Sequence, residues 1–297
     1  MRPSPINLMN THIVPVEFEY FEPRTLEEAL RLLDEWGEDA RVLAGGTDLL
    51  VQMKLRRVEP RCLINVKRLG LRYIREEGEE VRIGALTRLR DLERSELIER
   101  EFPALHEAVR AMASVQVRNM ATIGGNLCNA SPAADTAPPL MVYGARLRLK
   151  SLRGERAVPV EEFFRGPGET VLERGEILVE VEAPRPRGGS AFIKLSRTAM
   201  DLAKVNVAVL VSLEGGVISA ARIALGAVAP TPVRAREAER FLEGRAPTRE
   251  NFRRAGEIAS TEIRPITDLR STAWYRREVS KVLVADALER AVGRVGH

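Results

Sequence analysis

Hydrophobic positions near the start of the chain repeat first with helical and then with strand spacing. Residues 26–36 carry apolar side chains at intervals of three to four positions, and Gly37 follows them as a stop signal. Thr25 and Glu28 have the form of a capping box in front of this segment, so an amphipathic helix is predicted. Short apolar runs predict strands at 41–44 and 62–66, and a hairpin over 73–84.

The middle of the chain contains a long segment without clear periodicity. Helices are predicted around 89–97 and 104–113, and apolar patterning resumes at 140–143 and in a strand over 145–149. Between them, residues 118–139 are rich in small and polar residues and predict a loop. A compact domain rarely holds a loop of this length without a use for it, so the segment is a candidate functional region.

Glycine and proline mark a change of pattern in the second half of the chain. Gly166-Pro167-Gly168 and residues 184–189 separate the first region from a strand-rich one. An antiparallel sheet is predicted from strands at 191–194, 205–213 and 217–225, followed by helices at 235–242, 251–260 and 275–292. We therefore expect an α+β fold with a first domain over 1–180, a loose arm at 1–15, and a smaller α+β domain over 181–297.

Composition limits the chemistry that the chain can perform by itself. Its 297 residues favour two domains, and its two cysteines, Cys62 and Cys128, cannot build a disulfide framework, a structural zinc site or a four-thiolate iron–sulfur cluster. The net charge is only +4, and Arg and Glu are interleaved along the predicted helices, which is typical of solvated faces. We therefore expect no nucleic-acid binding. Because no apolar window approaches the ~18 residues of a membrane span, we expect no membrane span and a cytoplasmic location.

Two diglycine segments are the most informative features of the sequence. Gly45-Gly46 is followed by Thr47, and Gly124-Gly125 lies between Thr122 and Asn126. Consecutive glycines can form a nest of backbone N–H groups for an anionic oxygen, and two such nests would suit a diphosphate. The alternative is that each pair only makes a tight turn. Neither segment has the glycine spacing of a Rossmann fingerprint or a P-loop, so those nucleotide sites are excluded.

These motifs carry a resemblance to a known family. Residues 42–50 and 121–126, together with Ser131-Pro132 and Asp135, resemble the FAD-binding subunit of molybdenum hydroxylases, the family of xanthine dehydrogenase and aerobic carbon monoxide dehydrogenase. The resemblance covers nearly the whole chain and implies a two-subdomain FAD-binding domain of the vanillyl-alcohol oxidase type. It places around the FAD diphosphate Val42, Leu43, Ala44, Gly45, Gly46, Thr47, Asp48, Leu49, Thr122, Ile123, Gly124, Gly125 and Asn126.

The same resemblance assigns residues to the rest of the cofactor. Asp135 would accept hydrogen bonds from the ribityl or ring region, and Met112 would lie near the flavin. Leu178 would pack on the ring, and Lys194 would face the cofactor, where a cation favours the anionic reduced flavin. The alternative for Lys194 is a strand-edge lysine in water. Asp201 would border the exposed side of the flavin.

The resemblance also implies an electron-transfer function without a catalytic residue or a metal on this chain. Electrons would pass from [2Fe–2S] clusters on a partner chain through FAD to an external acceptor. The partners would be a large molybdenum-binding subunit and a small iron–sulfur subunit, as a dimer of heterotrimers. One alternative is a self-contained FAD-dependent oxidoreductase of the same fold that acts on a small molecule, and another is a binding module that has lost FAD. Substrate and acceptor stay open.

Overall fold

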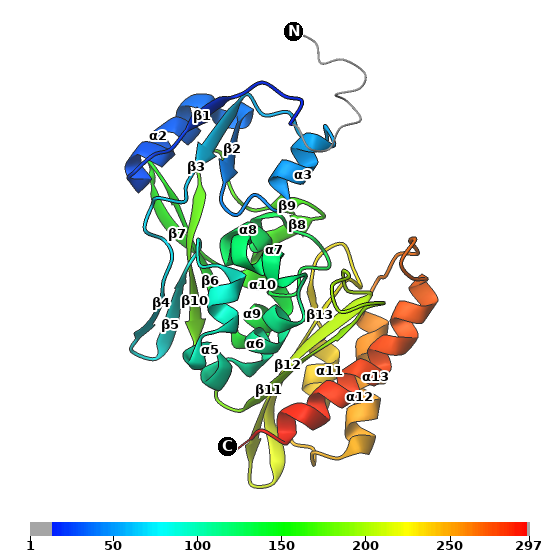
Figure 1. Cartoon of the computed structure of the whole chain (residues 1–297). Helices are drawn as coiled ribbons and strands as arrows, with labels where there is room; N and C mark the ends of the chain where they lie inside the picture. The colour runs from blue at the N-terminus through cyan, green and yellow to red at the C-terminus, as the bar shows by residue number, and fades with distance from the viewer. Residues whose placement is uncertain (1–13, 296–297) are drawn as a thin grey trace.

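A computed structural model describes residues 14–295, so most of the expected N-terminal arm lies outside the described residues. The first layer is a parallel three-stranded sheet in the order β1-β3-β2, with β1 at Glu19–Phe21, β3 at Cys62–Asn65 and β2 at Ala40–Leu43. Helix α2 (Leu26–Trp36) packs on it, its N-terminus capped by the Thr25 side chain as predicted, and α3 (Leu49–Lys54) lies at the end of β2 (Figure 1).

The second layer is an antiparallel five-stranded sheet covered on one face by short helices. Its order is β4-β5-β10-β6-β7. The strands span Ile74–Glu77 (β4), Glu80–Gly84 (β5), Ile177–Pro184 (β10), Arg146–Ser151 (β6) and Gly154–Pro159 (β7). The helices are α4 (Leu89–Glu93), α5 (Glu96–Glu101), α6 (Pro103–Arg110), α7 (Val115–Met120), α8 (Ile123–Cys128), α9 (Ala137–Tyr143) and α10 (Val160–Phe163), and a small β8–β9 pair spans Phe164–Gly166 and Glu169–Thr170.

The loop that was predicted for residues 118–139 is wrong in its local structure. This segment contains the end of α7, all of α8 and the start of α9, joined by short connections. The side chains of Ser114 and Thr122 cap α7 and α8 by accepting hydrogen bonds from backbone N–H groups. With six residues each, α7 and α8 are too short to show a hydrophobic repeat in the sequence, and α8 also contains two glycines.

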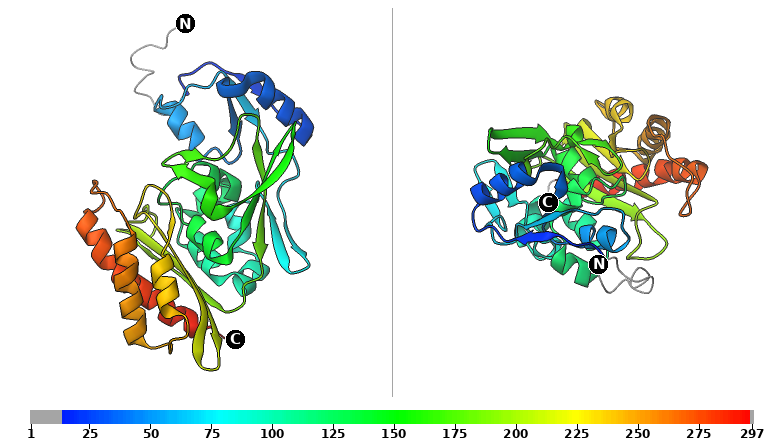
Figure 2. Two further views of the ribbon diagram at one scale, coloured as in Figure 1. Left: turned by 180° about the vertical axis from the view of Figure 1, so that it is seen from behind. Right: turned by 90° about the horizontal axis from the view of Figure 1, so that it is seen from above.

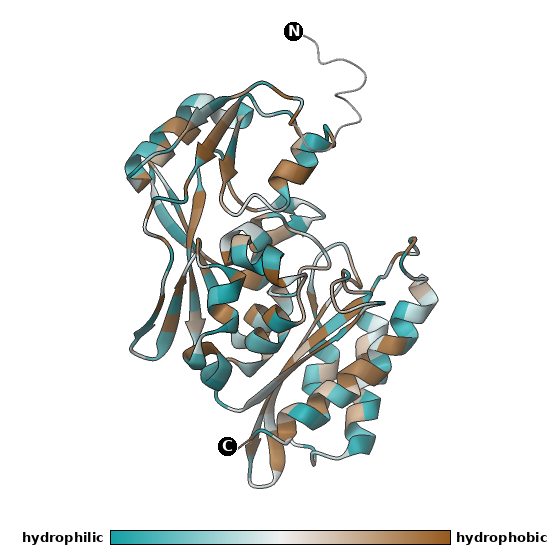
Figure 3. Ribbon diagram, viewed as in Figure 1, coloured by the Kyte–Doolittle hydropathy of each residue, from teal (hydrophilic) through white to brown (hydrophobic). Residues whose placement is uncertain are grey.

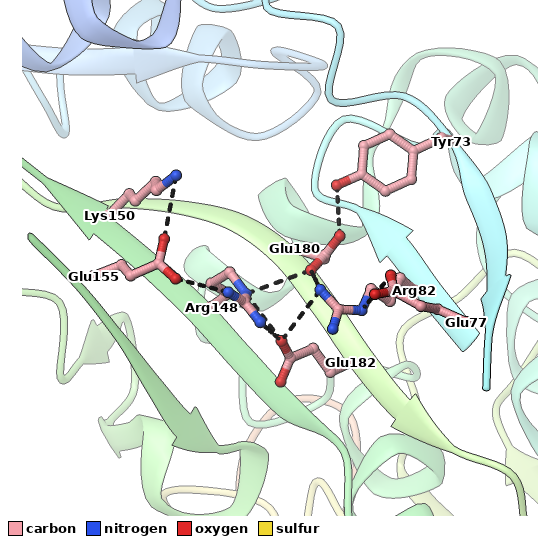
Figure 4. A network of polar contacts seen from close by, with 8 residues as sticks. All are labelled: Tyr73, Glu77, Arg82, Arg148, Lys150, Glu155, Glu180 and Glu182. Atoms are coloured by element: carbon pink, nitrogen blue, oxygen red, sulfur yellow. Dashed lines mark hydrogen bonds and ion pairs between the residues drawn. The ribbon is translucent and has the colours of Figure 1, made fainter. Parts of the chain in front are cut away.

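The outer face of the five-stranded sheet carries a network of charged side chains (Figure 4). Glu180 and Glu182 lie on β10 between Arg82 on β5 and Arg148 on β6, and both carboxylates are largely buried by these neighbours. The Tyr73 hydroxyl donates a 2.6 Å hydrogen bond to Glu180. The opposite face of the same strand, with Val181 and Ala183, belongs to the hydrophobic core under the helices.

The last region is a four-stranded antiparallel sheet that lies between two sets of helices. Its strands β11 (Gly189–Leu195), β12 (Val205–Glu214), β13 (Val217–Gly226) and β14 (Val233–Arg234) follow the predicted order, with Gly215 and Gly216 both at positive φ in the turn. Helices α11 (Arg236–Leu242), α12 (Arg249–Glu262) and α13 (Ala273–Val292) cover its outer face (Figure 2). Alternating hydrophobic and polar bands along α13 are visible in Figure 3.

Strand β12 contributes to two hydrophobic cores at once. Val205, Val207 and Val209 pack under α11–α13, whereas Ala208 and Leu210 belong to the core of the first region. Strands β11–β13 therefore connect the two regions through contacts with α6 and α9. Within residues 14–295 no helix is both long and apolar enough to cross a membrane, and no group of three or more potential metal-ligating side chains is found.

Candidate functional site

The two diglycine segments, 79 positions apart in the sequence, meet in the structure. A Cβ built on Gly45 would overlap the carbonyl oxygen of Met120 and lie 2.9 Å from the Cα atom of Ala121. Met120 and Ala121 directly precede Thr122, the residue that caps α8. Gly45 is therefore required for close contact between the two backbones, and Gly46, at φ +78°, turns the chain into α3.

The first segment exposes backbone donors. Among the described residues, the N–H groups of residues 45–49 have no hydrogen-bond acceptor in the protein. Thr47 adds a hydroxyl, 3.5 Å from the Asp48 carboxylate, and desolvation raises the pKa of Asp48 above its ordinary value. A run of adjacent, unpaired N–H groups is suited to an anionic oxygen, as the sequence predicts.

The second segment is different, because its first N–H groups are already used. Ile123 donates to the Thr87 carbonyl at 3.0 Å, Gly124 donates to the Ala85 carbonyl at 2.9 Å, and Gly125 donates to the Thr122 hydroxyl at 3.1 Å. A Cβ on Gly124 would lie 2.7 Å from the Ala85 carbonyl oxygen. The second segment therefore provides a close-packed surface, and the prediction that it forms a second N–H nest is wrong, because its N–H groups donate within the protein.

Several predicted residues converge on an apolar pocket of about 130 Å³. Its lining includes Val42, Ala44, Gly124, Gly125, Cys128 and Leu178. Glu176 lies at this pocket and is held by two hydrogen bonds from Arg156, at 2.7 and 2.8 Å. Burial raises the pKa of the Cys128 thiol to about 12, so this residue is an inert part of the wall.

A second group of predicted residues forms a buried polar cluster at the junction of the two regions. The Lys194 ammonium on β11 lies 2.8 Å from the Asp135 carboxylate and 3.0 Å from the Ala111 carbonyl oxygen. Both charged side chains are 4 % exposed, so the alternative of a strand-edge lysine in water is wrong. The Asn206 amide on β12 donates a 2.6 Å hydrogen bond to the other oxygen of Asp135.

The electrostatics of this cluster follow from its burial. Desolvation raises the pKa of the Asp135 carboxyl, while the charge of Lys194 and the hydrogen bonds from Lys194 and Asn206 act in the opposite direction. The Lys194 ammonium has three N–H donors, and two of them have acceptors in the protein. Lys194 also lines a cavity of about 510 Å³ together with Ala111 and Ser114.

Met112 lies next to this cluster, in the turn between α6 and α7. Its sulfur is 3.9 Å from the Asn126 amide nitrogen, and the Asn126 oxygen accepts a 2.6 Å hydrogen bond from Thr136. Arg118 fixes the turn by donating to the carbonyl oxygens of Met112 and Ala113, at 2.6 and 3.0 Å, while pairing with Glu93. The sequence did not identify Arg118, although it directly precedes the second motif.

The predicted residues thus fall into two places rather than one. Leu178 lines the apolar pocket together with the glycines of α8, whereas Lys194 lines the larger cavity beside Ala111. Leu43 and Ile123 are buried in the cores. Asp201 pairs with Arg197 at 2.9 Å at a third cavity, of about 320 Å³.

Comparisons with known proteins agree with this geometry. A family model described as the FAD binding domain in molybdopterin dehydrogenase matches residues 16–186, and one described as the CO dehydrogenase flavoprotein C-terminal domain matches residues 190–291. The carbon monoxide dehydrogenase medium chain of Hydrogenophaga pseudoflava is 39 % identical over 95 % of this chain and 99 % of its own length. The glyceraldehyde dehydrogenase medium chain of Sulfolobus acidocaldarius is 36 % identical over 93 % of this chain and 98 % of its own.

Solved structures give the same answer for the fold. A chain of the Hydrogenophaga pseudoflava carbon monoxide dehydrogenase superposes with a TM-score of 0.93 at 40 % identity, covering 96 % of this chain and all of that one. A chain of quinoline 2-oxidoreductase from Pseudomonas putida gives a TM-score of 0.89 at 30 % identity, with 93 % and 97 % covered. The chain therefore belongs to the family of FAD-binding subunits of molybdenum hydroxylases, as the resemblance of its two glycine motifs implies.

Proposed function

We propose that residues 45–49 hold the diphosphate of FAD, and that the two ring systems of the cofactor lie on either side of α8. As a member of this family, the chain is the FAD-carrying component of an oxidoreductase. The single observation that supports the placement best is the run of unpaired N–H groups at residues 45–49, beside the contact between Gly45 and Met120. A diphosphate carries the negative oxygens that such donors bind.

The two cavities differ in chemistry, which suggests which ring each receives. The pocket at Leu178 is almost entirely apolar and lies against Gly124 and Gly125, which suits the flat adenine base. The cavity at Lys194 is more polar than this pocket, because Arg110 and Arg118 line it together with Lys194, and it offers a buried cation. Leu178 is therefore proposed to pack on the adenine rather than on the isoalloxazine ring.

The residues around Lys194 then have defined tasks. FAD, when bound, supplies the electron-accepting and electron-donating chemistry. The Lys194 ammonium would stabilise negative charge on the ring, and Asp135 would hold the ammonium at a fixed position. Met112 and Asn126, which are in contact, would provide one wall. Asp201, paired with Arg197, would border the exposed side.

We propose that electrons reach this chain from partner subunits. The relatives carry the names of medium chains or FAD subunits of carbon monoxide, glyceraldehyde and xanthine dehydrogenases, which implies further chains. Two cysteines cannot ligate an ordinary iron–sulfur cluster, so the clusters and the molybdenum cofactor belong on a small and a large subunit. A dimer of heterotrimers is the proposed assembly.

Two organisational proposals accompany this function. The domain boundary is proposed to lie in the connection between Pro184, where β10 ends, and Gly189, where β11 begins. A cytoplasmic location is proposed because Cys62 and Cys128 are both free thiols, which is typical of a reducing compartment. Cell fractionation with an antibody to the chain tests the location.

Purification of the chain with and without its neighbours tests the function. A yellow chain that takes up FAD, and that co-purifies with a large chain and a cysteine-rich small chain, is the expected result. A colourless chain that does not bind added FAD would contradict the cofactor assignment. Reduction of the bound flavin by a small-molecule substrate, with no partner present, would favour the self-contained oxidoreductase.

A further inference from the structure

Asn206 is the one member of the polar cluster that neither the sequence motifs nor the family resemblance identified. It lies on β12 within the run 205–211, which is otherwise apolar, and it is fully buried. Its amide nitrogen donates a 2.6 Å hydrogen bond to one oxygen of Asp135, while the other Asp135 oxygen accepts from Lys194. The two carboxylate oxygens are thus divided between Asn206 and Lys194.

The amide oxygen of Asn206 has no hydrogen-bond partner among the described residues. A buried polar atom without a partner destabilises the folded state. If residue 206 only filled space, an apolar side chain there would give a more stable fold. The opposing strand accommodates the amide, because Gly226 is paired with Asn206 in the ladder and a Cβ on Gly226 would overlap the Asn206 oxygen. The structure therefore orients this side chain specifically toward Asp135.

We propose that Asn206 is a positioning residue, which fixes the Asp135 carboxylate so that the Lys194 ammonium keeps one N–H directed into the cavity that it lines. This inference rests on the proposed function, because it concerns how the chain presents Lys194 to the flavin. The cluster joins three segments: Asp135 comes from the loop after α8, Lys194 from β11 and Asn206 from β12. Asn206 thereby fixes a cofactor-facing group without facing the cofactor itself.

Few other charged groups act on this carboxylate. Among the described residues, the pKa of Asp135 is set by burial, by the Lys194 ammonium and by the amide of Asn206. Arg110 and Arg118 line the same cavity as Lys194, and Arg118 is paired with Glu93. A change at Asn206 should therefore alter the protonation of Asp135 directly.

The isosteric variant Asn206→Asp separates positioning from space filling. At acid pH the two facing carboxyl groups share one proton, which replaces the amide N–H as the donor. As the pH rises both carboxyls ionise and repel each other, so the unfolding midpoint of the FAD-free chain should fall below that of the wild type. FAD affinity should weaken over the same pH range, by roughly tenfold or more.

Two further variants complete the experiment, which uses the full chain with added FAD. Asn206→Ala removes the donor at every pH, so its dissociation constant for FAD should rise about tenfold without the acid recovery. Leu210→Ala, on the same face of β12, is the matched control and should lower stability without a pH-dependent change in FAD affinity. In an Asp135→Asn background, Asn206→Asp should lose its alkaline defect.

The outcomes separate this inference from the assignment of the cofactor. If Asn206→Asp follows the wild type across the whole pH range in both measurements, Asn206 only fills space and the proposal is overturned. If the wild-type chain binds no FAD, the proposed cofactor site fails, while the unfolding midpoints of the FAD-free variants still test the hold of Asn206 on Asp135.

Discussion

Gly45 and Met120 pack backbone against backbone, and a Cβ on Gly45 would lie 2.9 Å from the carbonyl carbon of Met120 and overlap its oxygen. This contact joins the segment with unpaired N–H groups to the one that begins α8. The first segment supplies the N–H groups of the proposed diphosphate site, and the second provides the surface on which it packs. The contact therefore fixes the position of the proposed diphosphate site relative to α8.

Gly45→Ala should accordingly separate the two segments. Overpacking of this kind typically costs about 1–3 kcal/mol, and here the strain falls on the N–H groups that would bind the diphosphate. We expect the dissociation constant for FAD to rise by roughly tenfold or more, measured by quenching of flavin fluorescence. Gly293→Ala is the control, because Gly293 is exposed, has a negative φ at the C-cap of α13 and has no close neighbours. Equal FAD affinity in the two variants would argue against the site.

Lys194→Met should leave the Asp135 carboxylate buried without its partner charge. Breaking a buried ion pair from one side typically costs about 3–5 kcal/mol at neutral pH. Because burial then raises the pKa of Asp135 further, the folded state binds a proton more strongly than the unfolded state, and stability should recover as the pH falls. Urea unfolding of the FAD-free chain at several pH values measures this.

Lys150→Met is the control for the loss of a lysine. Lys150 pairs with Glu155 at 3.2 Å on the sheet surface, and both side chains are about two-fifths exposed, at 40 % and 42 %. Its removal should change the unfolding free energy by less than about 1 kcal/mol. A Lys194→Met variant as mild as this control, with no pH dependence, would contradict the importance of the buried pair.

Leu178→Ala should weaken both folding and FAD binding. Truncation of a buried leucine typically costs about 2–5 kcal/mol, and here it also removes a wall of the apolar pocket. Leu140→Ala, in α9, removes the same atoms from a fully buried site away from that pocket. Calorimetric titration with FAD should therefore show lost affinity for Leu178→Ala alone. If Leu178 contacts the adenine, the affinity for adenosine diphosphate should also fall in Leu178→Ala and stay unchanged in Leu140→Ala.

Tyr73→Phe should alter stability in alkaline solution. Burial and the hydrogen bond to Glu180 raise the pKa of Tyr73 to about 12, above its ordinary value of 10.0. The folded state therefore holds this proton more tightly than the unfolded state does. The contribution of Tyr73 to the unfolding free energy is fully present below the unfolded pKa of 10.0, and it is lost as the pH rises through the folded pKa of about 12. The variant should show a shallower alkaline decrease in unfolding free energy, and an unchanged slope would contradict this.

Much of the fold follows from local sequence signals. The N-cap at Thr25, the turn at Gly215-Gly216 and the strand pattern of β12 are each encoded by neighbouring residues, and the structure confirms them. The full capping box is not formed, because the Glu28 carboxylate accepts from the Arg24 N–H rather than from that of Thr25. Helices α7 and α8 are not predicted by the pattern, because with six residues each they are too short to show a helical repeat. Their stability comes from capping and from packing against distant segments, which periodicity does not register.

The candidate site was predictable only in part, for a similar reason. Glycine motifs mark positions where backbones approach closely, so Gly45 and Gly124 could be identified from the sequence. Asn206 could not, since its partner Asp135 is 71 positions away and a single polar residue in a strand has no local signature. The same long range conceals the contact between Gly45 and Met120, which depends on how the two layers pack.

The cluster of Asp135, Lys194 and Asn206 contains residues from both domains, and this affects how the protein folds during its synthesis. During synthesis the segment with the open N–H groups emerges early, but Asp135 has no cation until β11 appears and no amide until β12 pairs with it. A nascent chain shorter than about 206 residues would therefore hold FAD loosely or not at all. Flavin capture should therefore be among the last events of folding.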